Sequence, residues 1–168
     1  DGDPDLLFVN SGHWPWRPPA GPPARILHLY KNDGRGRFTD ASAGSGLEAS
    51  LYGMGAAVGD YDNDGRVDVF ISGIGGNRLF HSLGDGRFED VSARAGIARH
   101  VGKGMSAAIA DYDRDGRVDI VVTNDTVPNF LFRNKGDGTF EETALLAGVS
   151  VPASGRPVSS MGADFQDY

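Results

Sequence analysis

The sequence predicts an all-β protein built from β-propeller blades, and three observations support this fold class. The chain repeats itself three times, each period holds four short strand-like runs, and no useful length shows the 3.6-residue periodicity of a helix. In the third period these runs are MSAAIAD, VDIVVTN, NFLFRN and TFEETA. Four antiparallel strands in a period of about 50 residues are typical of a propeller blade.

The repeat is clearest in three segments that align without a gap, at residues 29–47, 79–97 and 131–149. Each segment is anchored by one phenylalanine at the same position: Phe38, Phe88 and Phe140. SLGDG and NKGDG predict tight hairpin turns, because glycine supplies a positive φ there. We expect periods at about 1–53, 54–104 and 105–160, with 161–168 beginning a further one.

The first period carries an insertion, SGHWPWRPPAGPPA, at residues 11–24. Its prolines predict a loop with polyproline character that protrudes from one face. One interpretation is a binding loop, with Trp14 and Trp16 as aromatic anchors for a protein partner or a sugar. The alternative is an insertion whose tryptophans fold back onto the blade.

Composition excludes several function classes. The absence of cysteine rules out disulfides, thiolate metal sites and a cysteine nucleophile. A formal net charge of −7, with no basic patch, argues against nucleic acid as a partner. No run of 18 apolar residues occurs, so no membrane insertion is expected.

Two stretches, GDYDNDGRVD at 59–68 and ADYDRDGRVD at 110–119, gather aspartates around one glycine. Two carboxylates about 5 Å apart repel by roughly 3 kcal/mol at an effective dielectric constant near 20, so such loops need a cation. Carboxylate oxygens without histidine or cysteine favour a hard ion, and many flexible oxygens favour Ca²⁺ over Mg²⁺. The predicted ligands are the side chains of Asp60, Asp62, Asp64, Asp68, Asp111, Asp113, Asp115 and Asp119, with the backbone carbonyls of Arg66 and Arg117.

Other chemistries fit these loops less well. An EF-hand needs a glutamate at the twelfth position, where Ile71 and Val122 stand. Paired carboxylates can perform acid–base catalysis, but two nearly identical loops favour structural sites over a single active centre. No nucleophile elbow occurs. The histidines show no ligand spacing and are expected at the surface or in turns: His13, His28, His81 and His100.

GMGAAVGDYDNDGRVDVFISG, GKGMSAAIADYDRDGRVDIVVTN and LFRNKGDGTFEETALLAGV resemble the FG-GAP/VCBS repeats of integrin-α-like β-propellers. The resemblance is greatest to the branch found in cartilage-acidic-protein and ASPIC/UnbV-type proteins, and it covers nearly the whole chain outside the insertion. It implies a calcium-stabilised propeller, typically of seven blades, in secreted or cell-surface proteins. It also implies a scaffold for protein or carbohydrate contact without catalysis of its own.

Both ends of the chain fall inside the Asp motif. Asp1, Asp3 (through its backbone carbonyl) and Asp5 match the second half of a loop, and Asp167 matches the first half. One interpretation is a fragment of a longer propeller. The other is head-to-tail association, in which Asp167 of one copy completes a site with the first residues of the next, giving a six-bladed ring or a filament.

The sequence therefore predicts a non-catalytic, calcium-binding interaction module that acts in adhesion or assembly outside the cytoplasm. Three alternatives remain at this stage: a carbohydrate-binding propeller that uses Trp14 and Trp16, a self-assembling ring or filament subunit, and an accessory domain of a larger secreted enzyme. The partner itself is not predicted.

Overall fold

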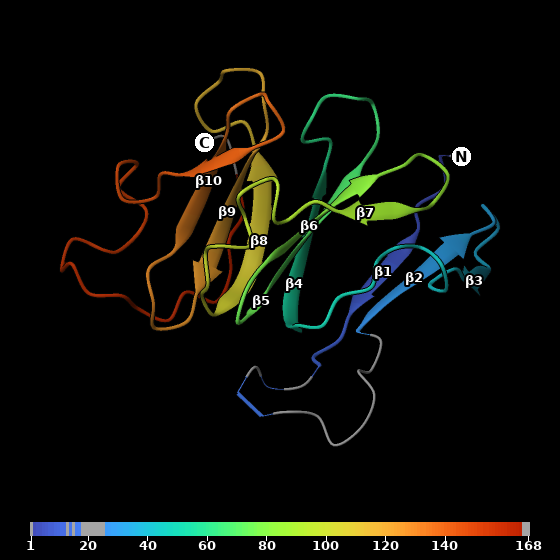
Figure 1. The fold of residues 1–168 in the computed structure, drawn as a ribbon, viewed down its shortest axis with the longest axis horizontal. Coiled ribbons are helices and arrows are strands. Elements are labelled where there is room, and N and C mark those ends of the chain that lie inside the picture. The colour runs from blue at the N-terminus through green and yellow to red at the C-terminus, as the bar shows by residue number, and fades with distance from the viewer. Residues whose placement is uncertain (1, 13, 15, 18–25, 166–168) are drawn as a thin grey trace.

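The computed structural model describes residues 2–12, 14, 16–17 and 26–165, and within them the protein consists of three antiparallel sheets without a helix (Figure 1). The first sheet contains β1 (Leu6–Val9), β2 (Leu27–Asn32) and β3 (Phe38–Asp40). The second contains β4 (Tyr52–Gly59), β5 (Asp68–Ile74), β6 (Arg78–Ser82) and β7 (Phe88–Asp90). The third contains β8 (Gly104–Ala110), β9 (Asp119–Asn124), β10 (Phe130–Asn134) and β11 (Phe140–Glu142).

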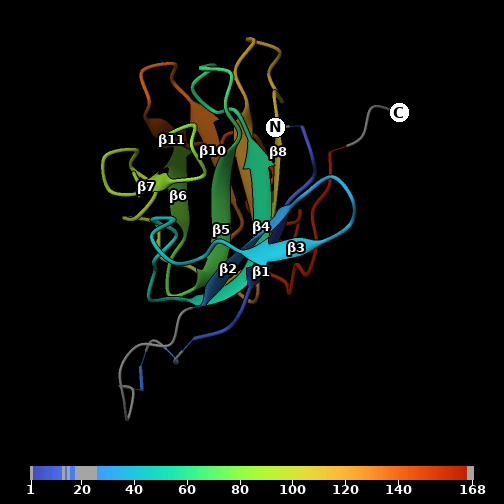
Figure 2. The ribbon, with the colours of Figure 1, turned by 90° about the vertical axis from the view of Figure 1, so that its right-hand side faces the viewer.

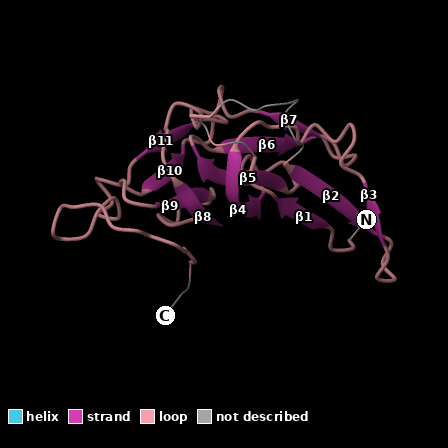
Figure 3. Cartoon of the chain, turned by 90° about the horizontal axis from the view of Figure 1, so that it is seen from below, coloured by secondary structure: helices cyan, strands magenta, loops and turns pink. Residues whose placement is uncertain are grey.

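Each sheet is a blade whose strands follow one another in sequence order, as the repeat predicts. We call them blade 1, blade 2 and blade 3 in chain order. β4 of blade 2 packs against β8 of blade 3, and the blades stand side by side without closing into a ring (Figure 3). The all-β, blade-type fold expected from the sequence is confirmed. The described residues contain no apolar helix long enough to span a bilayer.

Small residues on β4 let the innermost strands of blades 2 and 3 approach closely. A Cβ atom on Gly59 would lie 2.9 Å from Cγ2 of Ile109, and one on Gly55 would lie 3.1 Å from the carbonyl oxygen of Met105. Both distances are shorter than ordinary van der Waals contact. The run of glycine and alanine in β4 is therefore required by the packing of its neighbour.

Two apolar cores fill the spaces between the blades. The core between blades 1 and 2 is formed by Ile26, Leu27, Leu29, Leu47, Leu51, Val69, Ile71 and Phe80. The core between blades 2 and 3 is formed by Tyr61, Phe70, Leu79, Val91, Ala95, Ile97, Ala107, Ile120, Val122, Phe132 and Phe140. The central strands of blades 2 and 3, β5 and β9, are buried on both faces along most of their length. This is why their sequences alternate little between polar and apolar residues.

A backbone hydrogen bond repeats at both contacts between blades. Phe88 donates its N–H to the carbonyl of Ser45 at 2.7 Å, and Phe140 donates to the carbonyl of Ala95 at 2.9 Å. The phenylalanines that anchor the sequence repeat thus tie each blade to the one before it. The approach is closest at Gly46 (φ 77°), where a Cβ atom would lie 1.9 Å from the Phe88 carbonyl oxygen.

Blade 1 exposes the positions that blade 3 buries. Leu6, Phe8 and Phe38 are 42%, 52% and 43% exposed. Their repeat counterparts in blade 3 are Ile120, Val122 and Phe140, which blade 2 covers almost completely. The outer side of blade 1 is therefore an apolar face of the kind that packs against a preceding blade.

Candidate metal centre

The two Asp loops lie between the first and second strands of their blades. Residues 60–68 join β4 to β5, and residues 111–119 join β8 to β9. Both loops project from the same end of the molecule, at the top of Figures 1 and 2. The repeat therefore places two acidic loops side by side on one rim of the blades.

The loops have the same backbone conformation. Asn63 and Arg114 adopt positive φ angles of 58° and 61° at equivalent positions. Gly65 and Gly116 follow with φ of 84° and 85°. A side chain other than glycine is disfavoured at such angles, so the sharp turn predicted at each glycine is present.

The first aspartate of each loop organises that turn. Asp60 accepts backbone hydrogen bonds from Asp64 at 3.0 Å and from Gly65 at 2.8 Å. Asp111 accepts the equivalent bonds from Asp115 and Gly116 at the same distances. This repeated hydrogen bonding holds the loops folded around their carboxylates.

The last aspartate of each loop is buried. Asp68 accepts hydrogen bonds from the backbone N–H groups of Tyr61 at 3.1 Å and Ser82 at 2.8 Å. Asp119 accepts the equivalent bonds from Tyr112 and Asn134. Burial raises the pKa of both carboxyl groups, because a charge removed from water loses its hydration. A bound cation would compensate for that loss.

The loops bring their predicted ligand side chains together. Carboxylate oxygens of Asp60, Asp62 and Asp68 lie within 4.8 Å of one another, and so do those of Asp111, Asp113 and Asp115. In both loops an arginine side chain folds back: Arg66 pairs with Asp64, and Arg117 pairs with Asp115. The participation of the Arg66 and Arg117 backbone carbonyls stays a prediction.

A basic side chain faces each complete loop from the third strand of its blade. His81 on β6 places Nδ1 3.2 Å from Asp62 Oδ2 and 3.3 Å from Asp68 Oδ1. Its counterpart Arg133 on β10 donates from Nε to Asp113 Oδ2 at 2.6 Å. The expectation that His81 lies at the surface or in a turn is wrong: it sits on a strand, with its side chain 14% exposed. The signal that could have found it is the alignment of Lys31, His81 and Arg133 at one repeat position.

The sequence profile of the FG-GAP-like repeat family matches the chain three times, at residues 1–71, 60–122 and 111–167. These overlapping matches extend over nearly all of the chain. The chain belongs to the FG-GAP-like repeat family.

Curated relatives of this FG-GAP chain include cartilage acidic protein 1 from three animals. The Xenopus tropicalis protein is 35% identical over 134 residues, which are 77% of this chain and 20% of that protein. The human protein is 38% identical over 94 residues, 55% of this chain and 14% of that protein. The Mus musculus protein is 37% identical over 94 residues. The chain thus spans a fifth or less of the relatives that it matches.

The first FG-GAP repeat carries the second half of an Asp loop. Asp5 Oδ1 accepts a hydrogen bond from the backbone N–H of Asn32 at 2.9 Å, as Asp68 does from Ser82 in the second repeat. Asp5 therefore occupies the position of the last ligand. The role of the Asp3 carbonyl stays a prediction, and Asp1 and Asp167 lie outside the described residues.

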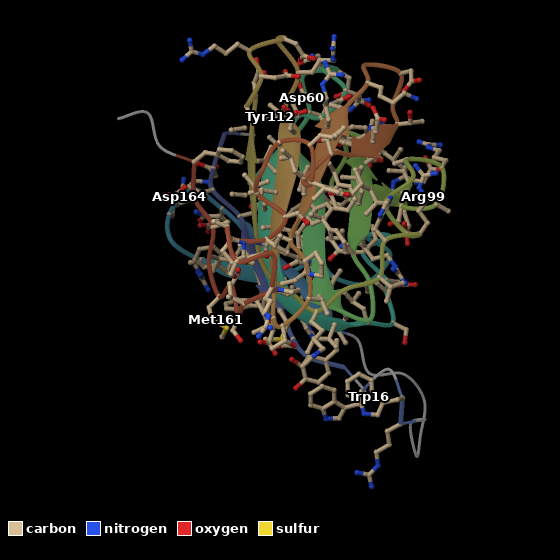
Figure 4. The ribbon with its side chains drawn as sticks, turned by 90° about the vertical axis from the view of Figure 1, so that its left-hand side faces the viewer. Trp16, Asp60, Arg99, Tyr112, Met161 and Asp164 are labelled. Carbon is tan, nitrogen blue, oxygen red and sulfur yellow. The ribbon has the colours of Figure 1, made fainter. Side chains whose placement is uncertain are left out.

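Trp16, in the described part of the insertion, lies at the end of the molecule opposite Asp60 and its loop (Figure 4). Trp14 stacks on Tyr52, with ring centroids 4.5 Å apart, and Trp16 stacks on Trp14 at 5.0 Å. Trp16 is 70% exposed. Trp14 thus folds back onto blade 2, whereas Trp16 presents its ring to solvent. Residues 13, 15 and 18–24 of the insertion, His13 among them, lie outside the described part of the chain.

Proposed function

We propose that this FG-GAP segment binds Ca²⁺ at the loops 60–68 and 111–119 and serves as a non-catalytic interaction scaffold. The observation that supports it best is the duplication of one geometry. Each loop buries its last aspartate, Asp68 or Asp119, against two backbone N–H groups, and each loop brings three carboxylates together, Asp60, Asp62 and Asp68 in one and Asp111, Asp113 and Asp115 in the other. Such a charge cluster is costly without a cation.

The residues present suit calcium. Each loop would hold the ion with four carboxylates and the carbonyl of Arg66 or Arg117, and water could complete the six to eight oxygen ligands that Ca²⁺ takes. Bound calcium supplies positive charge and a cross-link, not a reactive group. Because Asp68 and Asp119 also accept bonds from the third strand, the ion would hold three successive strands of a blade together.

We place this scaffold outside the cytoplasm, where calcium is abundant enough for sites of millimolar affinity. The resemblance to repeats of secreted and cell-surface proteins supports this location. Absence of catalysis is part of the same proposal, since each loop repeats a structural device and the carboxylates already serve as hydrogen-bond acceptors for the backbone.

Calorimetric titration with Ca²⁺ tests the proposal. We expect two sites per chain, and the loss of one with Asp60→Asn and of the other with Asp111→Asn. Asp137→Asn is the matched control, because Asp137 is exposed in a hairpin turn and bonds only with neighbours in that turn, such as Thr139. A titration without binding heat, and without a shift in melting temperature, would contradict calcium binding.

A second candidate function is carbohydrate binding at the opposite end. Three nearly parallel rings, Trp16, Trp14 and Tyr52, form a stack that ends in an exposed indole face, and such faces pack against sugar rings. Binding to a glycan array should be lost with Trp16→Ala and kept with Phe38→Ala, an exposed aromatic elsewhere. An array without bound glycans would eliminate this candidate.

The apolar face of blade 1 favours a third property, association with a second copy of this chain. The blade 3 positions equivalent to Leu6 and Phe8 are buried by a blade of the same repeat, so a second copy offers suitable chemistry. Light scattering in calcium should give a mass above about 18 kDa, and Phe8→Asp should return it to the monomer. A monomer under all conditions would reject head-to-tail association.

A further inference from the structure

The position that faces each Asp loop from the third strand differs between blades 2 and 3. It is the penultimate residue of β6 and of β10, occupied by His81 and Arg133. From this difference we infer that the two loops are unequal metal sites. His81 makes loop 60–68 the tighter site and lets it accept cations that favour nitrogen, such as Zn²⁺ and Co²⁺, whereas Arg133 weakens loop 111–119. The inference rests on the proposed metal binding and adds its selectivity.

His81 offers the first loop a donor atom. Its Nδ1 lies between the carboxylates of Asp62 and Asp68, and its Nε2 lies 3.8 Å from Asp64 Oδ2. Ligand atoms of Asp62, Asp64 and His81 all fall within 4.8 Å of one another. Nδ1 is buried and makes no hydrogen bond of good geometry with the described residues. A buried nitrogen that lies among carboxylates without a well-aligned hydrogen bond is suited to a metal ion.

The ring of His81 is held in place by packing. Tyr61 contacts it edge to face, with ring centroids 6.2 Å apart and planes at 86°. An imidazole nitrogen can donate a lone pair to a metal ion, which a guanidinium cannot do. Imidazole suits zinc, copper, iron and nickel better than calcium, so its presence widens the choice of ion at this loop.

Arg133 has the opposite effect on the second loop. Its Nε donates to Asp113 Oδ2 at 2.6 Å, and a terminal nitrogen donates to Asp115 Oδ2 at 3.3 Å. The guanidinium has no free lone pair and stays charged, so it cannot act as a ligand. A metal ion must displace this internal cation or bind beside it.

A second sequence difference between the two loops adds to the expected difference in their cation affinity. The left-handed position of the loop is Asn63 in blade 2 and Arg114 in blade 3. Arg114 and Arg133 therefore place two guanidinium groups at loop 111–119, where loop 60–68 has the amide of Asn63 and the imidazole of His81. One unit charge about 6 Å from a divalent ion weakens its binding on the order of tenfold in an aqueous dielectric.

Single-loop chains test the inference. Asp113→Asn leaves loop 60–68 intact, and Asp62→Asn leaves loop 111–119 intact. Calorimetry with Ca²⁺ should give an affinity about tenfold higher in the first chain than in the second. Visible absorption of added Co²⁺ should report a nitrogen-containing site in the first chain alone.

Exchange of the facing residue isolates its role. In the single-loop backgrounds, His81→Arg should lower the Ca²⁺ affinity and abolish the Co²⁺ spectrum, while Arg133→His should raise the affinity and create the spectrum. Arg133→Gln is a second variant that removes only the charge. A gain in Ca²⁺ affinity with it cannot result from misfolding. His28→Arg on β2, away from both loops, is the matched control.

The outcomes separate two questions. Equal Ca²⁺ affinities that residue exchange leaves unchanged would overturn this inference and leave the proposed calcium binding intact. Tighter binding at loop 111–119 would overturn it as well. Absence of calcium binding in every chain would instead overturn the proposed function.

Discussion

The contact between blades 2 and 3 leaves a cavity of about 340 Å³ at the rim of the Asp loops, half the volume of the cavity at the contact between blades 1 and 2. Tyr61 packs within the first contact, 5% exposed and 5.8 Å from the ring of Phe140. At the corresponding place beside blade 1 lies a cavity of about 680 Å³, lined by Leu7, Val67 and Ser82 among others. Within the described residues, a loop tyrosine lies between the blades at the contact of blades 2 and 3 alone.

Tyr61 connects the Asp loop of blade 2 with the packing of blade 3. The backbone N–H of Tyr61 donates to Asp68, a predicted ligand, while its ring belongs to the core shared with blade 3. Its carbonyl accepts a hydrogen bond from Asn134 Nδ2 of blade 3 at 2.7 Å. A cation bound at loop 60–68, as proposed, would therefore act on the neighbouring blade through Tyr61.

The largest expected effect comes from removing the ring of Tyr61 from the contact between blades 2 and 3. Tyr61→Ala should lower the free energy of unfolding by about 3–5 kcal/mol, the usual cost of deleting a buried aromatic ring. Urea denaturation measures it. Tyr112→Ala is the matched control, because Tyr112 holds the same loop position but is 36% exposed, and it should cost less than about 1 kcal/mol. Equal losses of unfolding free energy in the two variants would show that the Tyr61 ring does not stabilise the contact between blades 2 and 3.

A smaller effect should follow from the hydrogen bond across the same contact. Asn134→Ser, which installs the residue found in blade 2, removes the bond to Tyr61 and should cost about 1–3 kcal/mol. The matched control is Asn32→Ser, since Asn32 bonds to Pro4 within blade 1 as Asn134 bonds to Val118.

The difference between these two variants isolates the contact between blades, and urea denaturation measures both. We expect Asn134→Ser to be the more destabilising by about 1 kcal/mol. If both variants cost the same, the bond to Tyr61 adds nothing to the coupling of the blades.

The smallest effect concerns acid sensitivity. The ring centroid of His100 lies 5.3 Å from that of Phe132 in blade 3, and burial, followed by the charge of Arg99, lowers its pKa below 6.5. Neutral His100 therefore stabilises the folded state above pH 6.5, and this contribution is lost as the pH falls through the lowered pKa. Since the ring is partly exposed, we expect a fraction of a kcal/mol.

Thermal unfolding between pH 7 and pH 5 measures this contribution. His100→Leu should remove part of the acid sensitivity, and His28→Leu should leave it unchanged. The same pH dependence in all three proteins would show that protonation of His100 does not weaken the contact between blades 2 and 3.

Much of this fold could be predicted because its determinants are local. Short apolar runs and glycine turns set the strands, and the left-handed glycines Gly65 and Gly116 set the loops. His81 could not be placed in the same way, since it reaches the loop only through the pairing of β5 with β6, in which Val69 lies opposite Phe80. The hydrogen bond from Asn134 to Tyr61 joins two blades. An alignment of the repeats shows which positions are equivalent, but it does not show which positions of different blades are in contact.

The most direct test of the central claim is thermal unfolding of the chain in millimolar calcium and after chelation with EDTA. At a calcium concentration of about 100 times the dissociation constant, each site adds roughly 2.7 kcal/mol, so melting should shift upward by many degrees. A chain with both Asp60→Asn and Asp111→Asn should not respond. If the unaltered chain melts at the same temperature with and without calcium, the Asp loops are not calcium sites.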